Sequence, residues 1–560
     1  MSILFEKLVA TPTDNFGTPT SDEQAEVEES IQAFVESYQN ALRGKKEQQG
    51  STSNGKHVNL KDEEIPVPSL NKKMHVAFLR RILDPLPSNY LAYDSTRCWL
   101  IYWVAHSCLL MGFELGEPLR SRAITTLLHF QNQYTGGFGG GHGQNAHLMG
   151  TYASVMALAI LGGPGPCPDD DDVAMGISVD IGKGGWDAID RKKLYTFLLS
   201  LKQPDGSFTV NRDGEVDVRA TYCVICVSLM LGIATPELMR GVGNAIANCQ
   251  TYEGGLSSGS QPFDLLFSAP SLFQNAASLG EAHGGYAFCA MATHLALSLL
   301  PNPAEPNVSA FGPGKEEGGK RAQWHQSRSA SSSSLDVDRI SRWSAWQQGL
   351  PIEGGGFRGR TNKLVDGCYG WFSGAGLGTI LSVQLELQDG KWWLEDNAEG
   401  EPVTTSGESD GWESVTGNAE ENDVEGFLFD RKALQEYILV VAQAPQGGLR
   451  DKPGKRSDAY HTANNLAGLS LCQHRLEYNQ SSRQTLEKAW KSTEASKIEE
   501  HNSADNWRKE CYLSMMAFVS DPRYLCILGS DENRLGINHP IFNVPLTRSV
   551  PMLKWAYAQN

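Results

Sequence analysis

The chain has few positive charges for its length. Its 560 residues include 48 Lys and Arg against 65 Asp and Glu, which gives a net charge of −17 at pH 7. A surface that binds nucleic acid needs clustered Lys and Arg to replace the counterions of the phosphates. The composition therefore argues against a nucleic-acid partner, and any anionic ligand would have to bind in a local basic pocket.

The sequence also lacks a long apolar run. The longest, Cys223 to Ile233, is interrupted by Ser228 and Gly232 and is shorter than the roughly 18 residues of a membrane span. The first residues have neither the basic nor the apolar segment of a secretory signal. The eleven cysteines are odd in number and lie mostly in apolar helical patterns, which is typical of buried free thiols. We therefore expect a cytoplasmic protein with no disulfides and no integral membrane segment.

Several segments are too polar to form a packed core. Residues 1–70 are expected to form an N-terminal extension that is partly disordered, and insertions with loop composition are expected near 163–185, 302–336 and 395–425. The first insertion contains four aspartates at 169–172, where a solvated charge run is favoured over a metal site. The main domain is then expected at 71–530, with a C-terminal segment, 531–560, packing on it or on a partner.

Between these segments the sequence repeats one unit. A helix with apolar residues at i, i+3, i+4 and i+7 is followed by Gln, a Gly-rich turn, and a second helix with Tyr near its start. Asp190 and Asp430 are each placed to cap the first helix of a copy. Stacked helical hairpins predict an all-α fold, either an open solenoid or a closed ring. The repeat residues are Gln131, Gln203, Gln250, Gln348 and Gln443, with Tyr152, Tyr222, Tyr286, Tyr369 and Tyr460.

The second helices carry nearly all the unusual polar residues at their starts. We therefore place these helices inside a barrel, with their N-termini converging at one end. Free N–H groups and partial positive charge at helix N-termini make such an end suitable for an anion such as diphosphate.

Two segments, 356–369 and 450–462, concentrate the residue types that carry chemistry. The first contains several cations, Asp366 and Cys368, and the second ends near His461, at the start of the last inner helix. Asp366 and Cys368 are two residues apart, so an extended turn would aim both at one point. One oxygen, one sulfur and one nitrogen ligand would leave the fourth position of zinc open, as in catalytic zinc sites. Taken alone, such residues are more often ordinary core or surface positions.

Several segments together resemble the β subunit of protein farnesyltransferase. They are 136–152, 214–222, 281–286, 356–372 and 447–462, and the resemblance extends over most of 93–529. It implies an α-α toroid and Asp366, Cys368 and His461 as ligands of one Zn²⁺. It also implies an α subunit that completes a heterodimer, and acceptor proteins that end in a CaaX motif.

The same resemblance implies which residues bind the substrates. Arg360, Lys363, His283 and Tyr369 would form a donor-rich patch for the diphosphate of farnesyl diphosphate. Trp99 and Trp103 also lie at i and i+4 of an apolar run, where a plain core stripe is an alternative. The residues implied to line the lipid and peptide sites are Arg219, Tyr222, Tyr286, Trp99, Trp103, Tyr460 and Phe372.

Position 451 separates two kinds of family member. By resemblance, farnesyl-transferring members carry an Asp that helps to hold Mg²⁺ at the diphosphate, whereas type I geranylgeranyltransferases tend to carry Lys. Asp451 therefore favours farnesyl and implies Mg²⁺ beside the zinc, the alternative being that it caps a turn or pairs with Lys452 or Lys455. The order Trp371-Phe372 reverses the usual Phe-Trp of the family and places the smaller side chain at 372.

Three other readings share part of this pattern. A type I geranylgeranyltransferase β subunit is the alternative within the family. A terpene cyclase toroid would need an acidic D-x-D-D motif inside its cavity, and this sequence has that spacing only at 169–172. A non-catalytic repeat scaffold would need neither metal ligands nor diphosphate contacts. The zinc content of the purified protein would distinguish the last two classes from a prenyltransferase.

Overall fold

A computed structural model describes residues 8–13, 15–50, 69–169, 182–260, 278–301, 335–389, 427–490 and 503–558. Within these ranges the chain is mainly helical, as predicted. Two short antiparallel sheets pair β1 (Gly259–Ser260) with β2 (Ser278–Leu279) and β3 (Arg475–Tyr478) with β4 (Phe518–Asp521). The expected insertions at 302–336 and 395–425 lie almost wholly outside the described residues, as do residues 170–181 of the first insertion.

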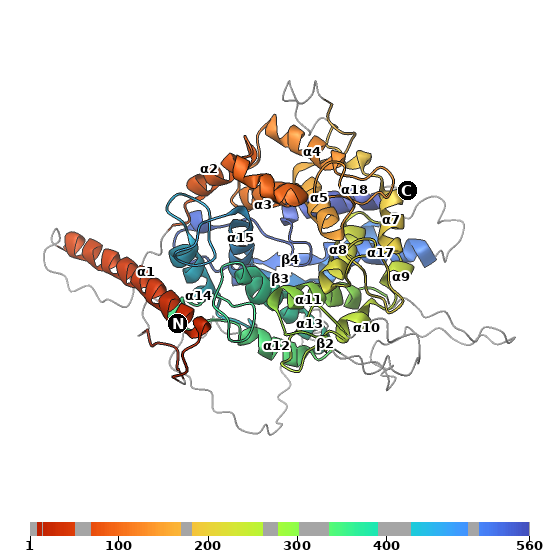
Figure 1. The fold of residues 1–560 in the computed structure, drawn as a ribbon. Helices are drawn as coiled ribbons and strands as arrows, with labels where there is room; N and C mark the ends of the chain where they lie inside the picture. Colours follow the sequence, from red (N-terminus) through yellow and green to blue (C-terminus); the bar gives the residue numbers. More distant parts are fainter. Residues whose placement is uncertain are drawn as a thin grey trace.

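The inner helices form a closed ring (Figure 1). Each packs against the next, and the last packs against the first, so the closed alternative holds over the open solenoid. These helices are apolar on nearly every side because they contact both their ring neighbours and the outer helices. In ring order they are α3 (Arg97–Leu110), α5 (Leu148–Leu161), α8 (Val218–Met230), α11 (Gly284–Ser298), η7 (Gly370–Ala375) with α13 (Gly376–Asp389), and α15 (Ala459–Gln473).

An outer helix precedes each inner helix in the chain. Asp190 and Asp430 cap two of these outer helices, as predicted, by accepting hydrogen bonds from the amides of Lys193 and Ala433, each at 2.9 Å. The segments η7 and η10, which border the site described below, are π-type turns, a feature often found at functional sites. The outer helices are α2 (Lys72–Leu83), α4 (Leu119–His129), α7 (Arg191–Ser200), α10 (Val242–Ala247), α12 (Val337–Ala345) and α14 (Arg431–Glu436) with η10 (Tyr437–Ala442).

Four of the five repeat glutamines, Gln131, Gln250, Gln348 and Gln443, link a hairpin to another outer helix. The expected fifth, Gln203, instead donates to the carbonyl of Leu201, and the neighbouring Lys202 donates to the carbonyls of Leu238 and Arg240. The side chain of Gln348 accepts a hydrogen bond from the amide of Asp430 and donates one to its carbonyl, both at 2.9 Å. Gln250 and Gln131 make the same pair of bonds to the capping residues of α12 and α7. Gln443 accepts from the amide of Asn71, the cap of α2, at 3.0 Å. The last repeat is therefore joined to the first by the same residue type, which explains why Gln recurs at this place.

The remaining elements cover the ring from outside. Helix α1 (Pro19–Gly50) lies in the N-terminal region, and its residues Val27, Ile31 and Val35 are buried at the i, i+4, i+8 spacing of one helix face. Helices α17 (Ser503–Met516) and α18 (Leu546–Ala558) pack on each other and on α8. The shorter elements are α9 (Pro236–Met239), α16 (Gln480–Ala489), η1 (Ser88–Thr96), η3 (Trp186–Ala188), η6 (Pro351–Glu353), η12 (Pro522–Tyr524) and η13 (Asp531–Asn533).

A C-terminal turn at residues 541–543 packs between three inner helices. Tyrosine hydroxyls from α3, α5 and α8 donate to three successive carbonyls of this turn, at 2.6 to 2.9 Å. Buried tyrosine hydroxyls need hydrogen-bond acceptors, and the carbonyls of the turn provide them. The turn therefore stabilises the three helices, and the helices hold the turn in place. The pairs are Tyr102 with Asn543, Tyr152 with Phe542, and Tyr222 with Ile541.

Among the described residues, no helix combines the length and apolarity needed to span a bilayer.

Candidate metal centre and active site

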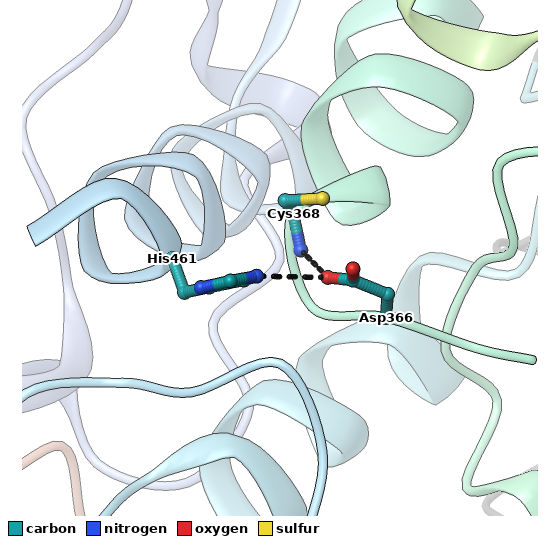
Figure 2. Close-up of side chains that lie close together, drawn as sticks. All are labelled: Asp366, Cys368 and His461. Carbon is teal, nitrogen blue, oxygen red and sulfur yellow. Dashed lines mark hydrogen bonds and ion pairs between the residues drawn. The ribbon is translucent and has the colours of Figure 1, made fainter. Parts of the chain in front are cut away.

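Asp366, Cys368 and His461 lie together where η7 and α15 begin (Figure 2). Their ligand atoms all lie within 4.8 Å of one another. An Asp366 carboxylate oxygen accepts a hydrogen bond from the amide of Cys368 at 2.8 Å, which folds the extended turn expected for residues at i and i+2. The His461 Nε2 atom lies 3.4 Å from the same carboxylate. The structure thus brings together the three residues that the sequence suggests as metal ligands.

Asp458 orients the imidazole of His461. It caps α15 by accepting from the His461 amide at 2.8 Å, and its second oxygen lies 2.7 Å from His461 Nδ1. Because Nδ1 is held in this way, Nε2 is the nitrogen that faces Asp366. A carboxylate on the far nitrogen is the usual support of a metal-binding histidine. Asp458 is not among the candidate residues predicted from the sequence, although an Asp three residues before a candidate ligand at a helix start is a recognisable signal.

The site holds two exchangeable protons when no metal is bound. Burial and the neighbouring Asp366 carboxylate raise the pKa of the Cys368 thiol well above its ordinary value. Burial lowers the pKa of His461, but hydrogen bonds to Asp366 and Asp458 outweigh it and raise the pKa to about 10. A carboxylate, a thiol and an imidazole are the donor types that Zn²⁺ prefers, so the residues present fit this ion. Zinc binding would replace both protons.

His283 and Tyr369 form a hydrogen-bonded pair beside this cluster. His283 caps α11, with its Nδ1 accepting from the amide of Gly285 at 3.0 Å. Burial and the charges of Arg360 and Arg219 lower the pKa of His283, so its imidazole is neutral and its proton is on Nε2. Nε2 lies 3.0 Å from the Tyr369 hydroxyl oxygen and donates to it. The hydroxyl hydrogen of Tyr369 therefore remains free to donate to a ligand.

Arg360 and Lys363 lie on the turn that leads into Asp366. Arg360 forms an ion pair with Glu281, and Lys363 is exposed to solvent. The turn stays close to the His283–Tyr369 pair because residue 359 is glycine: a Cβ there would lie 2.0 Å from the Tyr369 ring. The cations are thus held on a turn that packs directly against Tyr369.

Arg219 is fixed by a buried carboxylate. Asp217 caps α8 and accepts from the Arg219 guanidinium at 2.9 and 2.6 Å, a bidentate pair. The guanidinium lies 5.3 Å from the ring centre of Tyr286, whose ring in turn lies 4.8 Å from that of His283. Arg219 and Tyr286 therefore join the same group of residues as His283. Asp217, which is not among the residues predicted from the sequence, holds the Arg in place.

The expected aromatic residues form a continuous wall along the inner helices. Trp103 lies 5.4 Å from both Trp99 and Tyr460, measured between ring centres. Trp99 and Trp103 keep some accessible surface, whereas their neighbours in α3 are mostly fully buried. Farther round the ring, Tyr222 and Phe372 both contact the ring of Phe288, at 5.5 and 5.9 Å.

Asp451 lies next to the candidate metal ligands through its backbone. Its carbonyl accepts from the Gly367 amide at 2.8 Å and from the Tyr437 hydroxyl at 2.7 Å. Its carboxylate is paired with Lys452, with N–O distances of 2.5 and 2.6 Å. Burial and the nearby Asp366 carboxylate raise the pKa of Asp451, and Lys452 opposes that rise. Pairing with Lys452 is one of the alternatives to a Mg²⁺ role that the sequence leaves open for Asp451.

Comparison with known proteins relates this fold and site to one family. The model of the prenyltransferase alpha-alpha toroid domain matches residues 70–544. The chain is 34% identical to protein farnesyltransferase subunit beta of Pyricularia oryzae, over 73% of this chain and 64% of that protein's length. It is 32% identical to the corresponding subunits of Schizosaccharomyces pombe and pea, covering 81% and 87% of their lengths. The geranylgeranyl transferase type-1 subunit beta of Arabidopsis thaliana is more distant, at 22% identity.

The fold and the match across the whole ring define an α-α toroid prenyltransferase. Within that class, the chain belongs to the family of protein farnesyltransferase β subunits. The terpene cyclase and scaffold readings of the sequence are therefore set aside, and the type I geranylgeranyltransferase reading is the less similar one.

Proposed function

We propose that this chain is the catalytic β subunit of a protein farnesyltransferase, which joins the farnesyl group of farnesyl diphosphate to the cysteine of a C-terminal CaaX motif. The observation that carries the proposal is the meeting of Asp366, Cys368 and His461 beside the neutral His283–Tyr369 pair. Family membership supports the same reaction.

Asp366, Cys368 and His461 would hold Zn²⁺, with Asp458 orienting the imidazole. When bound, the ion would lower the pKa of the acceptor cysteine so that a thiolate is available at neutral pH. The protein's own part is to keep the three ligands converged before the ion arrives. The Asp366–Cys368 turn and the cap of α15 do this with backbone hydrogen bonds.

The diphosphate would lie against Arg360, Lys363, His283 and Tyr369. As the bond between the isoprenoid carbon and the diphosphate oxygen breaks, negative charge grows on the diphosphate, and fixed donors stabilise it. Tyr369 can donate its hydroxyl hydrogen because His283 already donates to its oxygen. We also propose that Mg²⁺ neutralises part of this charge with Asp451 as a ligand, in which case the ion must displace or share the Lys452 contact.

The aromatic wall would hold the isoprenoid and the end of the acceptor peptide. Trp99, Trp103 and Tyr460 are partly accessible inside a closed ring, where flat apolar side chains exclude water and orient a lipid chain. Tyr222, Tyr286, Arg219 and Phe372 would extend this wall. Asp451 and the higher identity to farnesyltransferase subunits favour farnesyl over geranylgeranyl.

A protein of this family is expected to work with an α subunit. We propose that the chain forms a heterodimer with such a subunit in the cytoplasm and acts on acceptor proteins that end in a CaaX motif. The decisive experiment is co-expression with candidate α subunits, followed by transfer assays with farnesyl and geranylgeranyl diphosphate on a CaaX peptide. We expect faster transfer of farnesyl and none from the Cys368→Ala heterodimer. Faster transfer of geranylgeranyl would support the type I alternative, and no transfer with any α subunit would contradict the proposal.

A further inference from the structure

Helix α1 lies outside the residues that the family model matches, yet it packs on the part of the ring that carries the candidate metal centre. It contacts η6 and η10, and Figure 1 shows it at the edge of the ring beside α14. Ile31 and Val35 are fully buried in this contact. Gln24 adds a polar contact by donating to the buried Glu353 carboxylate at 3.1 Å. An N-terminal helix is therefore docked on the outside of the site-bearing repeat.

One residue of α1 contacts Arg450, which precedes Asp451 in the chain. The Arg450 guanidinium lies 4.9 Å from the ring centre of Phe34, and Arg450 is only 7% exposed. The hydrogen bonds described for this guanidinium both go to the carbonyl of Val441, at 3.2 and 3.0 Å. An aromatic face stabilises a partly desolvated cation. Phe34 therefore helps to keep the Arg450 side chain in place.

The backbone at 450 and 451 contacts both arms of the metal centre. The Arg450 carbonyl accepts from Asn465 at 3.3 Å, and the same amide group of Asn465 donates to the carbonyl of His461 at 2.8 Å. The Asp451 carbonyl accepts from the amide of Gly367, the residue between Asp366 and Cys368, at 2.8 Å. These two carbonyls thus link the helix that carries His461 to the turn that carries the other two ligands.

We infer that Phe34 and Arg450 are positioning residues for the metal centre, and that α1 is part of the catalytic unit. The inference rests on the proposed function, because it assumes that Asp366, Cys368 and His461 bind zinc. Phe34 holds the Arg450 side chain, and the Arg450 side chain fixes the backbone at 450–451. That backbone in turn keeps the two ligand-bearing segments at a fixed distance from each other. Loosening this contact leaves the ligands present but less well converged, so the metal is released faster.

The test measures zinc release, not activity. Heterodimers containing the wild-type chain, Phe34→Ala, Phe34→Tyr or Val35→Ala are loaded with zinc, and its transfer to a chromogenic chelator is followed over time. Support residues directly behind metal ligands typically change affinity about 10- to 100-fold. Phe34 acts through one more residue, so we expect roughly 3- to 10-fold faster release from Phe34→Ala. Phe34→Tyr keeps the aromatic face and should release zinc at the wild-type rate.

Val35→Ala is the matched control, since it removes buried volume from the same helix without touching the ring that faces Arg450. It should lower thermal stability and leave zinc release unchanged. If Phe34→Ala does not fold, Phe34→Leu retains apolar bulk without the aromatic face and should still release zinc faster. The absorption of the Co²⁺-substituted protein should shift in the Phe34 variants that release zinc faster.

Equal release rates from Phe34→Ala, Val35→Ala and wild type would overturn the inference while leaving the proposed function intact. A wild-type heterodimer that binds no zinc would overturn both. Equal acceleration by Phe34→Ala and Val35→Ala would mean that α1 only adds general stability, which also contradicts a positioning role.

Discussion

Asp458 combines two roles in one side chain, because one oxygen caps α15 and the other holds His461 Nδ1. These roles can be separated by substitution. Asn is as good a cap as Asp but lacks the charge, whereas Ala provides neither function. The contact to the imidazole is therefore expected to affect metal binding, and the cap is expected to affect stability.

We predict that Asp458→Ala weakens zinc binding by about 10- to 100-fold and lowers the free energy of unfolding by about 1 kcal/mol. Asp458→Asn should retain most of the stability and lose part of the zinc affinity. Competition with a chelator measures the affinity, and thermal unfolding of the metal-free protein measures the stability. Zinc affinity that is unchanged in both variants would show that His461 needs no support from Asp458.

The protonation of the metal-free ligands determines how zinc binding depends on pH. Near pH 7.5 His461, with its pKa raised to about 10, is protonated, and Cys368, with its pKa also raised, is a thiol. Zinc uptake should therefore release two protons, and apparent affinity should rise by about 100-fold per pH unit in this range. Calorimetry in two buffers with different ionisation enthalpies measures the number of protons. Release of fewer than two protons would mean that at least one of these residues does not lose a proton when zinc binds.

The raised pKa of His461 also makes the stability of the metal-free protein depend on pH. Because the pKa of His461 is higher in the folded protein than in the unfolded one, its contribution to the stability of the metal-free protein is fully present below pH 6.5. The contribution is then lost as the pH rises toward about 10.

Substitution of Asp451 tests whether its carboxylate is a Mg²⁺ ligand or only a partner of Lys452. If the carboxylate helps to hold Mg²⁺ at the diphosphate, Asp451→Lys replaces a metal-dependent charge with a fixed one. Transfer by the wild type should accelerate as Mg²⁺ rises into the millimolar range, whereas the variant should respond little and should still bind zinc. Parallel Mg²⁺ curves would show that the contact to Lys452 is the whole role of Asp451.

At the scale of elements, the repeat glutamine is the contact that sets the register between hairpins. Gln348 makes hydrogen bonds to the backbone of Asp430 and to the carbonyl of Gly355. We predict that Gln348→Ala lowers the free energy of unfolding by about 1–2 kcal/mol, since these bonds are partly exposed. The control is Gln133→Ala, an exposed glutamine in another repeat turn, which should cost less than about 0.5 kcal/mol. Denaturant unfolding of both variants measures the difference.

The repeats could be predicted from the sequence because their signals are local. The apolar spacing of the outer helices, the caps Asp190 and Asp430, and the glycines of the turns all act within a few residues. The partner of the glutamine could not be predicted, because Asp430 is 82 residues from Gln348 in the chain. Helix α1 could not be predicted for a related reason: most of it is polar, and its buried face is defined only by the surface on which it docks.

The candidate site, too, could be predicted from the sequence only in part. The spacing of Asp366 and Cys368 indicates a shared turn, but His461 lies 93 residues beyond Cys368, and only resemblance to a family connects them. Asp458 and Asp217 are less visible because the contacts that matter are with other side chains of the protein, those of His461 and Arg219. Such supporting contacts depend on side-chain geometry, which a single sequence does not specify.

At the scale of the whole molecule, two contacts add to the closure that α15 makes with α3. Gln443 joins the last repeat to the cap of the first outer helix, and the C-terminal turn at 541–543 joins α3, α5 and α8. The second contact involves residues beyond the last hairpin, so it can be removed without interrupting any repeat. That separation allows a direct test of what the C-terminal segment contributes.

We predict that a chain ending at residue 530 does not reach the native state. Three buried tyrosine hydroxyls would lose their acceptors, at about 1–3 kcal/mol each, and α5 and α8 would lose the cover of α18. Together these losses approach the roughly 5–15 kcal/mol by which most proteins are stable. Near-ultraviolet circular dichroism and dye binding to exposed apolar surface would detect the collapse. A native spectrum would mean that the packing of α15 on α3 and the Gln443 link are enough to close the ring.

A synthetic peptide of residues 531–560 should then restore the native spectrum of the truncated chain, because the acceptors and the apolar cover return together. The matched control is the same peptide with Phe542→Ala, since Phe542 is fully buried and its carbonyl position is kept. Truncating a buried Phe costs about 3–5 kcal/mol, so this peptide should bind at least 100-fold more weakly. If both peptides bound equally, the three backbone carbonyls would be sufficient for closure and the buried ring would contribute nothing to it.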